Sequence, residues 1–148
     1  MLWVSLVAEA AIWGSYLFDI GLLLAHGKVD VGQATGGFIK SVVLLITVEV
    51  IAAIVLAIID PKDADAPADF RDREFAASAA VPAYTLLSAS IVVVMLLTPI
   101  IIAAAPRFVS GDPAMVSAIV LCNAMLLALV LAHLLHCGMQ LVRYRREG

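Results

Sequence analysis

The sequence predicts an all-α protein, an integral membrane four-helix up-and-down bundle that forms a single transmembrane domain over residues 1–148. Hydrophobic residues make up 64% of the chain and charged residues only 14%, whereas soluble domains are roughly half apolar and about a quarter charged. The apolar residues gather in four runs, and each reaches the roughly 20 residues that a helix needs to cross a bilayer. Lipid offers no partner to backbone N–H and C=O groups, so only helix bundles and closed barrels can span it.

The first span is expected over residues 3–25 and the second over residues 38–59. The first run lacks the positively charged start of a secretory signal and continues past the usual signal length, so we expect it to be retained. Three glycines in the polar stretch 28–37 indicate a turn region between these spans. Asp60 and Pro61 end the second span, because a proline just beyond a helix end is a common stop.

The third span is expected over residues 81–105 and the fourth over residues 114–142. Pro99 lies inside the third span and predicts a kink, since proline frees a backbone carbonyl of the preceding turn. Asp112 followed by Pro113 is a good helix start, with aspartate as the N-cap and proline at the first helical position. Short loops predict that helices adjacent in sequence are also neighbours in space.

The basic residues are unequally shared between the two sides of the membrane. Because successive spans alternate in direction, both termini and the charged segment 62–78 lie on the same side. By the positive-inside rule, this side is expected to be the cytoplasm. It carries six basic residues against three on the other side: Lys62, Arg71, Arg73, Arg143, Arg145 and Arg146 against Lys28, Lys40 and Arg107.

A charged motif precedes the third span, and it consists of Asp69, Arg71, Asp72, Arg73 and Glu74. Asp69 is expected to cap a helix that runs into the span, and Asp69 and Arg73 have the i,i+4 spacing of a supporting ion pair. Three interpretations stay open. The motif is a salt-bridged anchor that pairs with residues 143–146, a docking site for a partner or lipid headgroup, or a cation site built from its three carboxylates.

This motif, a span that opens with Tyr84, and the ending Tyr144-Arg145-Arg146 resemble a family of small bacterial four-helix membrane proteins. That family carries an Asp-Glu-Arg-Asp-type motif between spans two and three. Phe70 stands where the family has glutamate, which departs from a shared acidic site. The resemblance implies this architecture in a bacterial cytoplasmic (inner) membrane, and it implies no particular reaction.

Ionisable residues inside a span are costly and are therefore candidate functional residues. Helical phase, with a rise of about 1.5 Å per residue, places four of them in the cytoplasmic half of the bundle, with two hydroxyl groups nearby. Three readings compete for this cluster: hydrogen bonds between helices, a proton or cation pathway, and a site for Zn, Mn or Fe. The four are Glu9, Glu49, His133 and His136, and the hydroxyls belong to Tyr84 and Ser88.

Two further charges lie near the opposite face, and the sequence predicts that they form an ion pair. Asp19 belongs to the first span and Lys40 to the second, each within a few helical turns of the outer surface. A buried pair of this kind more often fixes the register of two helices than performs chemistry.

These features favour a non-catalytic interaction or accessory protein without a cofactor, whose partners are the lipid bilayer and either further copies of itself or another membrane protein. The alternative is a proton- or metal-linked transporter or channel that uses the polar cluster. No phosphate loop, nucleophile elbow or HExxH motif occurs in the sequence. A net charge of −3 without a basic stripe excludes nucleic-acid binding.

Overall fold

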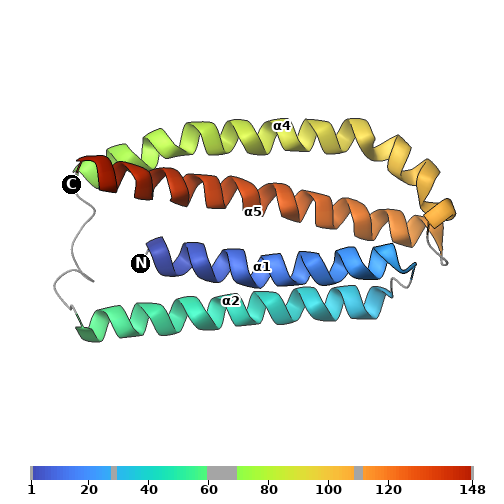
Figure 1. Ribbon diagram of the computed structural model, residues 1–148, viewed down its shortest axis with the longest axis horizontal. Coiled ribbons are helices and arrows are strands. Elements are labelled where there is room, and N and C mark those ends of the chain that lie inside the picture. The colour runs from blue at the N-terminus through green and yellow to red at the C-terminus, as the bar shows by residue number, and fades with distance from the viewer. Residues whose placement is uncertain (1, 28–29, 60–69, 109–111, 148) are drawn as a thin grey trace.

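The computed structural model describes residues 2–27, 30–59, 70–108 and 112–147. Within these ranges the protein has four helices and no strand: α1 (Leu2–Ala25), α2 (Val31–Ile59), α4 (Phe70–Phe108) and α5 (Pro113–Glu147) (Figure 1). All four helices are long and apolar enough to cross a membrane. The expected all-α, four-helix architecture is therefore confirmed.

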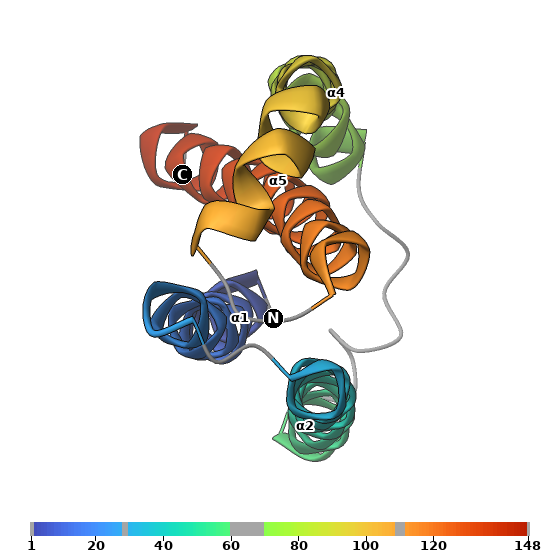
Figure 2. The ribbon, with the colours of Figure 1, turned by 90° about the vertical axis from the view of Figure 1, so that its right-hand side faces the viewer.

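The helices alternate in direction, and α5 occupies the centre of the bundle (Figures 1 and 2). α4 packs extensively on α5, while α1 packs on both α2 and α5. The expectation that sequence neighbours are always spatial neighbours is wrong for α2 and α4, which share at most marginal contact among the described residues. The ten residues 60–69 between them can span up to about 33 Å, so this connection does not force the two helices together.

The helix α2 begins seven residues earlier than expected, at Val31 instead of residue 38. The Asp30 side chain caps it, because Asp30 Oδ2 accepts a hydrogen bond from the Gln33 N–H at 3.1 Å. The Asp30 carbonyl accepts the first helical bond, from the Ala34 N–H at 3.0 Å. The interpretation of residues 31–37 as a turn is therefore wrong, and the glycines of this stretch lie inside a helix.

One of these glycines allows α1 and α2 to approach closely around an aromatic cluster. Trp13, Tyr16 and Phe38 have ring centroids 5.6 to 6.2 Å apart. A Cβ atom at Gly37 would lie only 3.2 Å from Tyr16 Cε2. The Tyr16 hydroxyl donates a hydrogen bond to the Ala34 carbonyl at 3.4 Å. A small residue at position 37 thus lets the buried tyrosine lie directly against the backbone of α2.

The helix α4 runs without interruption from Phe70 through the charged motif and past Pro82 into the apolar segment. Its members from Arg71 to Glu74 therefore lie in the first turns of a long helix, as expected for a helical segment that continues into the third span. Figure 1 shows α4 bending over its yellow-to-orange end. A bend in this part of the helix agrees with the kink expected from Pro99.

The start of α5 follows the sequence prediction closely. Asp112 Oδ1 accepts a hydrogen bond from the Ala114 N–H at 3.0 Å, and Pro113 is the first helical residue. The Asp112 carbonyl accepts a further bond from the Val116 N–H at 3.0 Å. The helix continues to Glu147, beyond the expected end of the span at residue 142, so its basic end is also helical.

Candidate functional site

Two polar contacts join α1 to its neighbours in the part of the bundle where the sequence predicted a cluster. Glu9 Oε2 on α1 lies 3.3 Å from His133 Nε2 on α5. The Ser5 hydroxyl, one turn before Glu9 on α1, donates a hydrogen bond to Glu49 Oε2 on α2 at 3.1 Å. Three of the predicted site residues, Glu9, Glu49 and His133, therefore gather around the same side of α1.

The two members of the Glu9–His133 pair differ in exposure. The Glu9 side chain is 13% exposed, whereas the His133 side chain is 52% exposed. The carboxylate thus lies between the helices, and the imidazole reaches from it toward the outside of the bundle. An ion pair forms here only if His133 is protonated; with a neutral imidazole the same contact is a hydrogen bond from Nε2–H to the carboxylate.

His136 is satisfied within its own helix. Its Nε2 lies 2.7 Å from Nε2 of Gln140, one turn further along α5, and Gln140 is buried. An amide nitrogen donates, so in this contact the imidazole Nε2 of His136 is the acceptor. His136 therefore lies beside the cluster without a contact to either glutamate.

The structure does not bring Tyr84 and Ser88 to the cluster. Both residues lie on α4, which is separated from α1 and α2 by α5 (Figure 2). The Tyr84 side chain is 73% exposed, and Ser88 is half-buried. Helical phase correctly placed these two residues on one face of the helix, but the neighbour that this face would contact depends on the helix arrangement, which phase does not determine.

The metal interpretation lacks a ligand set in the part of the chain that the structure describes. No three histidine, cysteine, aspartate or glutamate side chains gather there in a group that could hold a metal ion. Glu9 and His133 meet, but His136 bonds to Gln140 and Glu49 bonds to Ser5. The four weak candidates for metal ligands are thus divided among three separate contacts.

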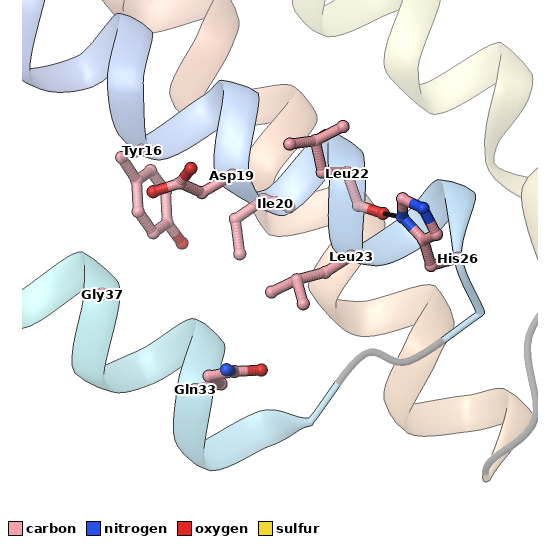
Figure 3. A pocket seen from close by; sticks show the side chains of 8 residues that line it. All are labelled: Tyr16, Asp19, Ile20, Leu22, Leu23, His26, Gln33 and Gly37. Carbon is pink, nitrogen blue, oxygen red and sulfur yellow. Dashed lines mark hydrogen bonds between the residues drawn. The ribbon is translucent and has the colours of Figure 1, made fainter.

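Asp19 and Lys40, the expected ion pair, are both exposed and do not meet within ion-pair distance among the described residues. Asp19 instead lines an open cavity of about 560 Å³ between α1 and α2, together with Tyr16 and Gln33. Figure 3 shows these side chains around the cavity, with His26 bonded to a carbonyl of its own helix. Sequence position placed both charges at one end of the bundle, but it did not fix the directions in which they point.

The charged motif joins the start of α4 to the end of α5. Asp72 Oδ1 accepts a hydrogen bond from the Tyr144 hydroxyl. The Tyr144 ring packs edge-on against the buried Phe75, with centroids 5.1 Å apart and an interplanar angle of 84°. The Arg71 guanidinium lies over the Phe75 ring, 5.3 Å from the ring centroid. These contacts favour the anchor among the three interpretations of the motif.

The next members of the motif lie on the surface of the protein. Arg73 and Glu74 are exposed on the first turns of α4. Asp69 lies outside the described residues, and so do its expected roles as helix cap and as partner of Arg73. Among the described residues, the link between the motif and the end of α5 includes the contacts of Tyr144 with Asp72 and Phe75.

The aromatic cluster of Trp13, Tyr16 and Phe38 was not predicted from the sequence. A signal for it was present, because Gly37 directly precedes Phe38 in an apolar run and small residues mark close helix contacts in membranes. Asn123, whose buried side-chain oxygen has no hydrogen-bond partner among the described residues, was not predicted either.

Comparisons with known proteins returned nothing similar: no family model, no curated protein and no solved structure matches the chain. The contacts of its own residues are therefore the basis for any functional assignment.

Proposed function

We propose that this chain is a non-catalytic, multi-pass membrane protein that works as a subunit of a membrane assembly, in its simplest form an assembly of its own copies. The observation that carries the proposal is the half-exposed imidazole of His133 on an apolar helix. Four long apolar helices support insertion into a bilayer. The described side chains gather no metal-binding group, and the hydrogen bonds of the cluster support a role in holding helices together.

The position of His133 makes its exposure informative. It lies ten residues before Arg143 and twenty residues after Pro113, which corresponds to about 15 Å and about 30 Å along the helix. The hydrocarbon core of a bilayer is about 30 Å thick, so the imidazole lies within it when Arg143 lies at the membrane surface. Exposing a polar, ionisable group to lipid is costly, and a covering protein surface removes that cost.

The residues around His133 indicate which surface is covered. Exposed residues follow α5 at i,i+3/i+4 spacing along the edge of its contact with α1; we call them the α5 stripe, which consists of Cys122, Met125, Leu129 and His133. Two copies in one membrane share the same orientation, so a two-fold axis parallel to the helices places identical residues opposite each other. A second copy would then cover His133 with the same stripe.

The localisation that accompanies this proposal is a bacterial cytoplasmic (inner) membrane with both termini in the cytoplasm. The excess of basic residues on the side of Arg71 and Arg143 supports this orientation. The resemblance of the charged motif to small bacterial four-helix membrane proteins supports the membrane assigned. Labelling of a cysteine placed at position 71 by a membrane-impermeant reagent added outside intact cells would overturn the orientation.

Oxidative cross-linking in isolated membranes tests the α5 stripe directly. Cys122 is exposed on it, and a disulfide requires Cα atoms within about 7 Å. The wild type and Cys137→Ser are expected to yield a disulfide-linked dimer, and Cys122→Ser is expected to yield none. Cys137 is buried on the same helix and is therefore a matched control. A dimer absent from all three proteins, or one lost in Cys137→Ser instead, would contradict this contact.

A second candidate function is proton-linked transport, and one observation favours it. Titratable groups of three helices follow one another from Glu49 through Glu9 to the half-exposed His133. In this case His133 would face a water-filled path and not a second copy. Proton flux into proteoliposomes that falls in Glu49→Gln and in His133→Leu supports transport. If the wild type shows only the proton flux of protein-free liposomes, proton-linked transport is refuted.

A further inference from the structure

The basic end of α5 forms a groove that no contact described above uses. The cavity has a volume of about 640 Å³ and is lined by one face of this helix. Gly138, Met139 and Val142 contribute apolar lining, and Arg143 and Arg146 contribute two guanidinium groups at the helix end. The groove thus changes along its length from apolar to strongly cationic.

The spacing of the two arginines suits a phosphate group. Arg143 and Arg146 are three residues apart, so they project from nearly the same side of α5. Each guanidinium offers a planar set of donors that matches phosphate oxygens. The ion pair between Glu9 and His133 involves neither arginine.

The apolar part of the groove suits an acyl chain. A Cβ atom at Gly138 would meet nothing within 4 Å, so the helix surface is open at this point. Met139 and Val142 continue the apolar lining toward the arginines. A ligand that matches both parts carries a negative phosphate next to a hydrocarbon chain, and free phosphate would use the cationic end alone.

We propose that this groove binds an anionic phospholipid, with its phosphodiester between Arg143 and Arg146 and an acyl chain along Gly138. Basic pockets at the ends of membrane helices select lipid headgroups in this way. The inference rests on the membrane insertion that forms part of the proposed function, and it is independent of self-association. The cavity beside Arg107, near the C-terminal end of α4, differs from this groove. Its volume is smaller, about 350 Å³, and a single arginine lines it.

Lipid titration of the purified full-length protein in detergent, followed by native mass spectrometry, tests the site. The probes are phosphatidylglycerol and phosphatidylcholine with identical acyl chains. The wild type is expected to bind phosphatidylglycerol roughly tenfold to thirtyfold more tightly, since each basic residue near the headgroup contributes about fivefold. The double variant R143Q/R146Q is expected to lose this preference.

The matched control is R145Q, which changes one charge on the same helix end at a position that does not line the groove. R145Q keeps the preference if the groove is the site. A preference reduced equally in R145Q and in single variants R143Q and R146Q indicates a general attraction to the basic end and overturns the proposal. A second variant, Gly138→Leu, fills the apolar part without changing charge and is expected to weaken the binding of both lipids.

Two further results distinguish a phospholipid from a free phosphate compound, and failure of the lipid site from failure of the proposed self-association. Glycerol phosphate, which has no acyl chains, is expected to compete weakly; competition as strong as that of the lipid would overturn the assignment to a phospholipid. A missing lipid preference in a protein that still forms the Cys122 cross-link removes the groove and leaves the proposed function intact. A protein that keeps the preference but forms no cross-link removes self-association alone.

Discussion

A double-mutant cycle on Glu9 and His133 measures whether their contact holds α1 and α5 together. The perturbations are Glu9→Leu, His133→Leu and the double variant. The two side chains meet at 3.3 Å, with Glu9 only 13% exposed and His133 52% exposed. Hydrogen bonds between helices in membranes contribute about 0.6 kcal/mol on average and up to about 1.7 kcal/mol. Because the carboxylate is nearly buried and the imidazole half-exposed, we expect a coupling free energy of about 1 kcal/mol.

Equilibrium unfolding in mixed detergent, followed by circular dichroism, supplies the four unfolding free energies. The double variant is expected to lose about 1 kcal/mol less stability than the sum of the single variants, since each single change already breaks the contact. Thr85 is a control, because its hydroxyl bonds only to the carbonyl of Val81 in its own helix. Thr85→Val and His133→Leu should be additive. Additivity of the Glu9 and His133 changes within about 0.3 kcal/mol would refute the role of the pair.

Two other predictions concern packing contacts of the same bundle. Gly37→Ala should lower the unfolding free energy by about 1 to 2 kcal/mol, because its Cβ would lie 3.2 Å from Tyr16 Cε2 and overpacking exceeds the gain in helix propensity. Gly36→Ala, with open space around the new Cβ, should leave the unfolding free energy unchanged or raise it by up to about 1 kcal/mol, and equal losses at both positions would contradict this explanation. Tyr144→Phe keeps the ring but removes the hydrogen bond to Asp72, so it should cost about 1 kcal/mol and speed amide hydrogen exchange in the first turns of α4. Unchanged exchange there would show that the hydroxyl contributes nothing to the junction.

The helices themselves could be predicted because each depends on a local pattern. The length of the apolar runs predicted all four helices, and the Asp112–Pro113 pair predicted the first residue of α5 correctly. The pattern misled at residues 31–37, where glycine was taken as a turn signal. In membrane helices glycine also serves close packing, and Gly37 does so against Tyr16.

The site was predicted only where helical phase and depth were sufficient. Glu9 and His133 come together because they lie at similar depth on α1 and α5, and these two helices are neighbours. Tyr84 lay on an equally plausible stripe, but α5 stands between its helix and α1. Asp19 and Lys40 are both exposed near one end of the bundle and form no ion pair with each other. Helix order and rotation are set by the sum of many side-chain contacts, which no single spacing contains.

We propose that another copy of the protein covers the half-exposed His133 within the bilayer. The most direct test is single-molecule photobleaching of fluorescently labelled protein in liposomes at high dilution, where chance co-occupancy is negligible. Most liposomes that hold the wild type are expected to show two or more bleaching steps, and His133→Leu is expected to shift the distribution toward one step. A wild-type protein that bleaches in a single step at every dilution would contradict it.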